Sequence, residues 1–137
     1  MFLVVDANIM FSFFNKNSAR RKVVERLRPK LELIAPDFAF EELIKDKGRV
    51  QKYARISSND FLILFSLLEN VIKSVPKSEY DGFFNDAEKL APHSKDIPYF
   101  ALALSLNCAI WSDENSFKKQ PKVKVFSTSD LVKELKL

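Results

Sequence analysis

Five acidic residues lie where a chain could assemble a reactive site, because each ends an apolar run or belongs to the segment after one. They are Asp6, Glu42, Asp96, Asp113 and Glu114. Asp6 directly follows the apolar residues 2–5, and in open α/β sheets the ligand crevice lies beyond the carboxyl ends of the strands. A nucleotide-binding domain places a glycine-rich turn there, so that phosphate can approach the backbone. An acid in that place attracts cations instead, which predicts a site for a hard metal ion.

Carboxylates gathered at one edge of a sheet repel one another, and one of them protonates unless a cation compensates. Mg²⁺ and Mn²⁺ prefer oxygen ligands, so either ion fits such a cluster. A bound ion could generate a hydroxide nucleophile and stabilise the charge of a phosphate group. We therefore expect the carboxylates of Asp6, Glu42 and Asp96 to converge within a few ångströms.

Plainer explanations exist for the single acids. An acid at the start of a helix is often a cap or a complement to the helix dipole, which is an equal alternative for Asp96. For Glu42 alone, a solvated helix face is the favoured alternative. Asp6 is harder to explain in this way, because an acid that closes a buried strand is costly without a partner. Spacing alone leaves the reaction undecided.

The composition removes most other chemistries. The chain has 137 residues, of which 47% are hydrophobic, and this favours one globular domain over residues 1–137. Two glycines cannot form a Walker loop or a dinucleotide fingerprint. The single histidine, His93, excludes sites with two imidazoles, and the single cysteine, Cys108, excludes disulfides and cysteine-rich zinc sites. Carboxylates, hydroxyls, lysines and arginines remain for catalysis.

The start of the chain and its charge bear on location and partners. No charged leader precedes the first apolar run, and no apolar stretch approaches the roughly 20 residues that cross a bilayer. The sequence therefore predicts a cytoplasmic protein without a membrane partner. The formal net charge of +4 is a mild indication of a polyanionic partner.

Apolar runs alternate with helical patterns along the chain, which predicts a central parallel β-sheet flanked by helices. Strands are predicted at residues 2–5, 31–35, 71–75, 108–111 and 123–126. Helices are predicted at residues 9–14, 18–28, 36–47, 57–69, 78–90 and 96–106, and near the C-terminus after a cap at Ser127 or Thr128. In the third helix, Phe40, Leu43 and Ile44 are expected to share a face, and Gly48 to end it. Residues 78–81 resemble a capping box.

Four segments resemble the motifs of PIN domains, in the expected order and across the whole chain. Residues 5–10 read Val-Asp-Ala-Asn-Ile-Met, and the family opens with an apolar strand, Asp, a small residue, Asn and aliphatic residues. Pro36 with Glu42 resembles the second motif, which is the least specific of the four. Residues 96–104, an Asp that opens an apolar helix, resemble the third and most specific motif, and residues 110–117 resemble the fourth.

The fourth motif departs from the family pattern of Ser or Thr, any residue, and then Asp. Aligning Ser112 and Phe117 with that pattern places Glu114 at the acidic position and Asp113 at the variable one. A small local shift would let Asp113 serve instead, and the sequence leaves both open. The longer arm of a glutamate would change the geometry of a metal site.

The resemblance implies a metal-dependent endoribonuclease, similar to the VapC-like toxins of toxin–antitoxin pairs. Asp6, Asp96 and Glu42 would hold Mg²⁺ or Mn²⁺, directly or through water, and the ion would activate water to attack an RNA phosphodiester. Asn8 and Ser112 would orient the carboxylates through hydrogen bonds, and ordinary turn or cap roles explain both equally well. PIN relatives also imply a homodimer and, in toxin–antitoxin pairs, an inhibitory antitoxin protein.

A nuclease with an acidic pocket needs basic residues to hold RNA. All six arginines fall between residues 20 and 55, and arginine pairs with phosphates bidentately. This segment is the candidate RNA track, with contacts predicted for Arg20, Arg21, Arg49 and Arg55. Six acids in the same segment make a solvated face an equal alternative. The lysines at 118, 119, 122 and 124 are a second candidate track.

Two other classes of protein compete with this interpretation. The alternative is a non-catalytic PIN module that binds RNA or a protein partner; Glu114 in the fourth motif favours it, and the presence of Asp6, Glu42 and Asp96 opposes it. An acid-pocket phosphotransfer domain fits poorly. A receiver expects an acidic pair by its first strand, and a haloacid-dehalogenase-like phosphatase expects an Asp where Asn8 stands.

Overall fold

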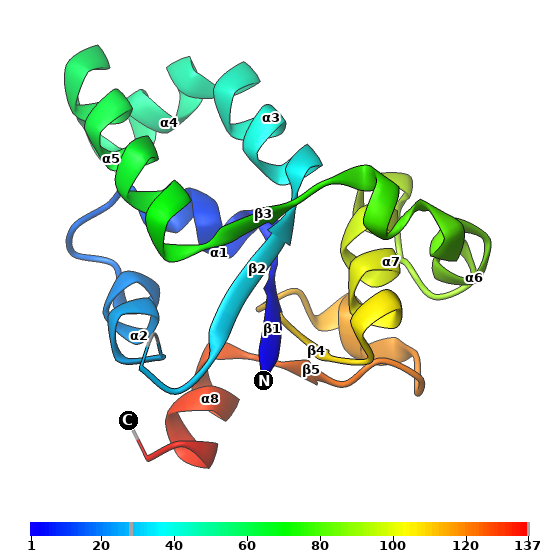
Figure 1. Cartoon of the computed structure of the whole chain (residues 1–137). Coiled ribbons are helices and arrows are strands. Elements are labelled where there is room, and N and C mark those ends of the chain that lie inside the picture. Colours follow the sequence, from blue (N-terminus) through cyan, green and yellow to red (C-terminus); the bar gives the residue numbers. More distant parts are fainter. Residues whose placement is uncertain (28, 137) are drawn as a thin grey trace.

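The computed structural model describes residues 1–27 and 29–136, which form a five-stranded parallel sheet with helices on both sides (Figure 1). The order across the sheet is β3-β2-β1-β4-β5. The strands are β1 Phe2–Val5, β2 Glu32–Pro36, β3 Lys73–Val75, β4 Ala109–Trp111 and β5 Val125–Phe126. The helices are α1 Ala7–Ser12, α2 Ala19–Leu27, α3 Asp37–Lys45, α4 Lys47–Ala54, α5 Ser58–Val71, α6 Phe84–Glu88, α7 Ile97–Leu106 and α8 Thr128–Glu134. The predicted α/β fold with a central parallel sheet is confirmed.

Strand β1 lies at the centre of the sheet, where Val4 pairs with Ile34 of β2 on one side and Ile110 of β4 on the other. Parallel strands that helices cover on both faces carry apolar residues at successive positions. Leu3, Val4 and Val5 are accordingly all buried. The chain leaves this strand at its carboxyl edge, and the next residue is the acid of the first motif.

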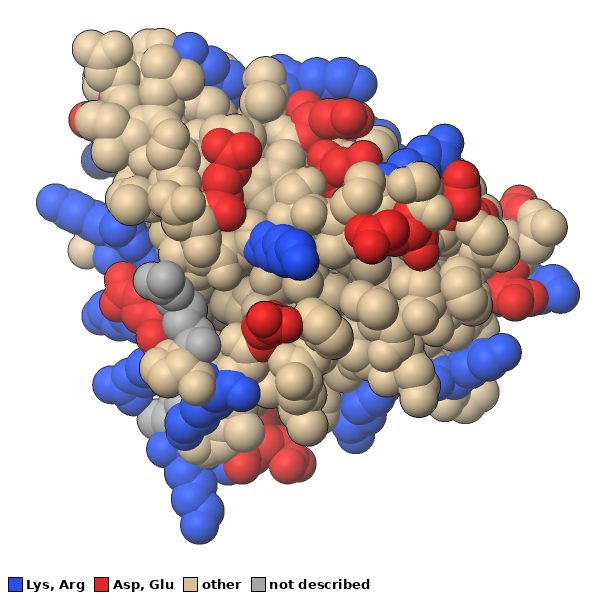
Figure 2. All heavy atoms as spheres, in the orientation of Figure 1, with Lys and Arg blue, Asp and Glu red and all other residues tan. Residues whose placement is uncertain are grey.

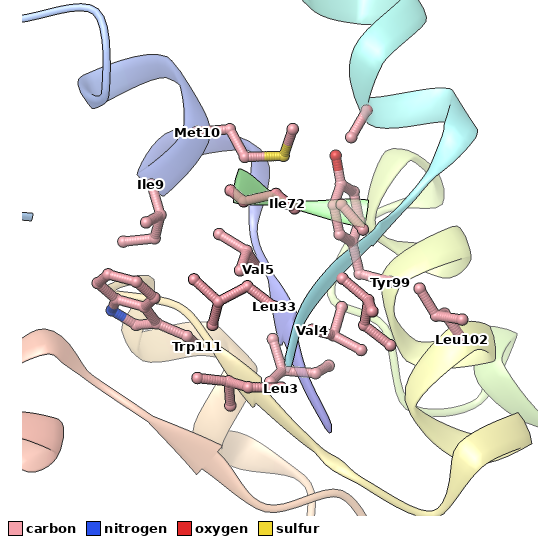
Figure 3. Close-up of a cluster of buried hydrophobic side chains, with 14 of the residues drawn as sticks. Leu3, Val4, Val5, Ile9, Met10, Leu33, Ile72, Tyr99, Leu102 and Trp111 are labelled. Carbon is pink, nitrogen blue, oxygen red and sulfur yellow. The ribbon is translucent and has the colours of Figure 1, made fainter. Parts of the chain in front are cut away.

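Helix α7 lies on one side of the strands in Figure 1, while α1 and α2 lie on the other. It contacts β1, β2 and β4, and five successive residues of it, 99–103, are buried. A helix that is apolar around its circumference belongs in a core. Figure 3 shows two of these side chains, Tyr99 and Leu102, in the same buried cluster as Val4.

The helix after β2 differs from its prediction at its C-terminal end and in the face that it buries. Helix α3 ends at Lys45, and Gly48 lies in the first turn of α4 instead of ending a helix. Asp46 makes the junction with φ −92° and ψ 14°, a conformation that needs no glycine. Phe40 is buried on the inner face as expected, but Ile44 is 57% exposed. The predicted shared face is therefore wrong for Ile44, because only a narrow stripe of α3 contacts the core.

The single capped helix predicted at residues 78–90 is also wrong. This segment holds two 3₁₀ turns, Lys77–Glu79 and Asp81–Phe83, and only then the short α6. The cause is tertiary: Asp37 accepts hydrogen bonds from the Tyr80 hydroxyl at 2.6 Å and from the backbone N–H of Lys77 at 3.1 Å. These bonds hold the segment against the start of α3 and favour tight turns over one long helix.

No helix is predicted over Lys47–Ala54, where the structure has α4. The strands and the other α-helices match their predictions to within a few residues, which is the usual uncertainty of helix ends. A capping box does occur at the start of α8, where Ser127 and Asp130 form it. The predicted end of the second helix, Arg28, lies outside the described residues. Among the helices that the structure describes, none is both long and apolar enough to cross a membrane.

Candidate active site

An acidic pocket of about 320 Å³ lies beyond the carboxyl ends of the central strands. Five carboxylates line it: Asp6, Glu42, Asp46, Asp96 and Glu114. They come from the segments after β1 and β4, from α3 and its junction with α4, and from the residue before α7, so the fold brings together acids that are distant in the sequence. Asn8 also lines this pocket.

Asp6 is the most enclosed of these acids, with 3% of its surface exposed. One carboxylate oxygen accepts the backbone N–H of Ala7 at 2.7 Å, and the other accepts the Ser112 hydroxyl at 2.8 Å. Burial raises the pKa of Asp6 to about 6, although these two hydrogen bonds oppose the shift and the charges of Asp96 and Glu114 add to it. Asp6 therefore caps α1 and also holds a costly charge, which a cation would stabilise.

Asp96 precedes the first turn of α7, but its side chain makes no capping hydrogen bond. The alternative explanation, in which Asp96 serves only as a helix cap, therefore lacks the hydrogen bond that a cap would make. Burial raises the pKa of Asp96, the charge of Glu114 raises it further, and His93 lowers it. The electrostatic coupling of Asp6, Asp96 and Glu114 is the repulsion expected when carboxylates share one site.

The two adjacent acids of the fourth motif have different places. Glu114 lines the pocket, and its Oε1 accepts a hydrogen bond from Asn8 Nδ2 at 2.6 Å. The Ser112 hydroxyl donates to Asp6 and accepts the backbone N–H of Glu114 at 3.1 Å. Asn8 and Ser112 thus connect the first and fourth motifs. Each makes a hydrogen bond to a carboxylate of the pocket, which is the contact expected of a residue that orients a carboxylate.

Asp113 is not among the residues that line the pocket. Its carboxylate accepts the Thr128 backbone N–H at 2.7 Å, the Thr128 hydroxyl at 2.6 Å and Arg20 Nε at 2.8 Å. Burial alone would raise the pKa of Asp113, but the hydrogen bonds from Thr128 and Arg20 outweigh it, and the pKa is lowered. Asp113 fastens the loop after β4 to α2 and α8.

Glu42 reaches the pocket from α3, where two lysines approach it. Lys45 Nζ lies 3.6 Å from one carboxylate oxygen and Lys95 Nζ lies 4.0 Å from the other. Over residues 1–27 and 29–136, no three Asp, Glu, His or Cys side chains are grouped closely enough to hold one metal ion. The expected convergence of Asp6, Glu42 and Asp96 within a few ångströms is therefore wrong for this state of the protein. Like charges repel one another, and Asp6 and Glu42 are paired with Ser112 and with lysines instead.

The acidic side chains of the pocket, which also contains Arg49, His93 and Lys95, suit the implied ion in their chemistry. They are carboxylates, one of them buried at a cost, and the pocket offers neither a second imidazole nor a thiolate among the residues described. Such a set fits Mg²⁺ or Mn²⁺, which take oxygen ligands. Mg²⁺ also keeps several waters and needs only one or two carboxylates, so loosely spaced acids can still hold a hydrated ion.

The four predicted RNA contacts fall in three places. Arg49 lines the acidic pocket, with its guanidinium 5.2 Å from the centre of the Phe11 ring. Arg20 pairs with Asp113. Arg21 and Arg55 line a separate pocket of about 610 Å³. On the face drawn in Figure 2, several acidic side chains gather at the upper right and the basic ones lie mostly toward the edges, with no continuous basic band.

Besides Asp46, three titratable residues of the acidic pocket are absent from the predicted site: His93, Lys95 and Tyr99. The signal that could find them is position, since all three lie within three residues of Asp96. Because His93 is the single histidine of the chain, the sequence uses it only to exclude zinc sites and gives it no role of its own. Lys95 and Tyr99 belong to residue types that are frequent on surfaces and in cores, so composition gives them no weight.

The fold and the pocket define an α/β domain with an acidic site at the carboxyl edge of a parallel sheet. The sequence model of the PIN domain matches residues 4–135, and the chain belongs to the PIN domain family. This confirms the resemblance found in the four motifs.

Solved structures with the same fold agree. A chain in the crystal structure of VapBC2 from Rickettsia felis, bound to a DNA fragment from their promoter, superposes with a TM-score of 0.70 and 14% identity over 93% of this chain and 98% of that one. A chain in the structure of VapBC-1 from nontypeable Haemophilus influenzae gives a TM-score of 0.64 and 19% identity with the same coverage. No curated protein matches the sequence.

Proposed function

We propose that this PIN domain is an endoribonuclease that cleaves RNA phosphodiesters with Mg²⁺ or Mn²⁺ in the acidic pocket. The observation that carries the proposal is the buried carboxylate of Asp6, which shares one pocket with four other acids and is linked through Ser112 to the loop of Glu114. A buried acid of this kind needs a compensating charge. Membership of the PIN domain family supports the same function.

Asp6, Asp96 and Glu42 would hold the ion. When bound, it supplies an activated water and positive charge for the phosphate oxygens. Ser112 and Asn8 keep Asp6 and Glu114 in fixed orientations through the hydrogen bonds already formed. We assign the fourth acidic position to Glu114, because the carboxylate of Asp113 is occupied by Thr128 and Arg20.

Three basic side chains would place the RNA phosphate. Arg49, His93 and Lys95 line the same pocket as the carboxylates. Arginine and lysine bind phosphate oxygens through charge-assisted hydrogen bonds. Their place beside the acids would bring the phosphodiester next to the ion and offset the repulsion between RNA and the acidic pocket.

We further propose that the protein is the toxin of a toxin–antitoxin pair, with an antitoxin protein as its partner. The likeness to chains of VapBC2 and VapBC-1 over almost their whole length supports this assignment. A homodimer is proposed as well. Leu62, Ile63 and Leu67 are large apolar side chains exposed on α5, and a surface that gathers such side chains would serve as the contact between two copies.

Cleavage of a labelled RNA by the purified protein, with Mn²⁺ and with a chelator, tests the activity. We expect cleavage with Mn²⁺ only, and a loss of several orders of magnitude in Asp6→Asn and Asp96→Asn. Glu69→Gln, which changes an exposed acid of α5 outside the pocket, is the matched control and should cleave normally. RNA binding without cleavage under every metal condition would favour the non-catalytic PIN module instead.

A further inference from the structure

Tyr99 is a buried side chain whose position ties it to the acidic pocket. It follows Asp96 by three residues, which places both on neighbouring parts of the same helix face. The side chain lines the pocket and is 2% exposed. In Figure 3 the ring lies in the apolar cluster, and the hydroxyl is at the end of the ring directed toward α3.

The hydroxyl of Tyr99 has no hydrogen-bond partner within residues 1–27 and 29–136. Among the residues that the structure describes, it is the single buried side-chain nitrogen or oxygen atom in that condition. A buried polar group without a partner is destabilising, and such groups are rare in native proteins. Phenylalanine would fill the same space without this cost, so the hydroxyl needs another explanation.

Three carboxylates of the same pocket, those of Asp6, Asp96 and Glu42, act on the Tyr99 phenol through their charges. Burial raises the pKa of Tyr99 well above its ordinary value, and the charges of Asp6, Asp96 and Glu42 raise it further. The phenol therefore stays protonated and can donate a hydrogen bond. The acids nearest to it have other partners in this state: Asp6 accepts from Ser112, and Glu42 faces Lys45 and Lys95.

We infer that Tyr99 is a positioning residue of the cation site, whose hydroxyl donates to a carboxylate oxygen once a divalent cation draws the acids together. The inference rests on the proposed function. A cation cancels the repulsion among the acids, and the carboxylates can then approach the Tyr99 hydroxyl, which lines the same pocket. Because this hydrogen bond forms only in the bound state, it stabilises that state alone and raises the affinity for the ion.

The test compares two buried tyrosines. Tyr99→Phe removes the unpartnered hydroxyl, and Tyr80→Phe removes a hydroxyl that donates to Asp37 at 2.6 Å, outside the acidic pocket. Both side chains are at most 2% exposed, so the two changes are matched in burial. The measurements are thermal melts without metal and calorimetric titration with Mn²⁺ alone, in wild type and both variants.

We expect Tyr99→Phe to melt at or above the wild-type temperature without metal, and to bind Mn²⁺ roughly ten- to a hundred-fold more weakly, as is typical when a group that orients metal ligands is lost. Tyr80→Phe should show the reverse: a lower melting temperature and unchanged Mn²⁺ affinity.

Equal Mn²⁺ affinity in wild type and Tyr99→Phe would overturn the inference and leave the proposed function standing. A Tyr99→Phe protein that melts lower or does not fold would also overturn it, because the hydroxyl would then be structural. A wild type that binds no Mn²⁺ would overturn the proposed function, and the role of Tyr99 with it.

Discussion

The carboxyl group of Asp6 combines deep burial with two hydrogen bonds and the repulsion of its acidic neighbours. Replacement by Asn keeps the shape and removes the charge. Without metal, Asp6→Asn should fold and melt at the wild-type temperature or a few degrees above it at neutral pH, because the repulsion is relieved. It should lose most of the stabilisation that Mn²⁺ gives wild type, since a ligand stabilises only the state that binds it. Melts of both proteins with and without Mn²⁺ measure this; a purely structural Asp6 predicts a lower melting temperature in the variant and no Mn²⁺ effect in either protein.

The same carboxyl group predicts a pH dependence. Its pKa is about 6 in the folded protein and 3.8 in the reference state. The folded state therefore binds more protons between these values, and the free energy of unfolding falls as pH rises from about 4 to about 6. The shift corresponds to roughly 3 kcal/mol, to order of magnitude. We expect the stability difference between Asp6→Asn and wild type, measured by urea unfolding without metal, to grow in favour of the variant over this window. Saturating Mn²⁺ should cancel or reverse that growth, and a difference that does not change with pH would contradict the raised pKa.

At the scale of elements, the loop after β4 is held in place by hydrogen bonds from Asp113 to helices α2 and α8. Asp113 joins Arg20 of α2 to Thr128 of α8, and Thr128 in turn accepts the indole N–H of Trp111 at 3.0 Å. We expect Asp113→Ala to lower the free energy of unfolding by about 1–3 kcal/mol, equally with and without Mn²⁺. Glu114→Gln, one residue further, should leave stability without metal unchanged or higher and weaken the Mn²⁺ effect. Urea unfolding of the pair distinguishes the two acids, and a Mn²⁺ effect abolished only in Asp113→Ala would reverse our assignment of the fourth motif.

The same elements show how far the sequence predicts the structure. Apolar runs sufficed for the strands, because a parallel strand covered on both faces leaves little choice of residue. They also placed Asp6 at the carboxyl edge. Prediction failed where distant residues decide the local structure: Tyr80 is held by Asp37, from a helix about forty residues earlier. Tyr99 escaped prediction for a similar reason, since only the folded chain shows that its hydroxyl lacks a partner among the described residues.

The whole molecule is expected to be a homodimer, and the exposed apolar side chains of α5 give this a test. Ile63 is 60% exposed, and Leu62 and Leu67 are exposed beside it. Burying such side chains is favourable by roughly 1.5–3 kcal/mol each, so Ile63→Glu should convert dimer to monomer. Sedimentation velocity over a range of concentrations measures the change, with Asn59→Glu at the exposed start of α5 as the control. A wild type that stays monomeric at every concentration would contradict the dimer.

In the proposed function, the distribution of charge over the molecule would decide where RNA binds. Basic residues are scattered on the face in Figure 2, but Arg49 and Lys95 lie in the acidic pocket, while Arg21 and Arg55 lie in another. We expect Arg49→Ala with Lys95→Ala to weaken RNA binding and to flatten its dependence on salt by about 0.7 in the logarithmic slope for each phosphate that the variant no longer binds. Binding is measured at several salt concentrations without divalent metal, so that no cleavage occurs.

Arg20 is left intact because it holds Asp113. The matched control is Arg21→Ala with Arg55→Ala, which removes the same number of charges. If the control flattens the slope and the pocket pair does not, the RNA track runs along the second pocket; if neither does, the lysines at 118, 119, 122 and 124 become the next positions to change.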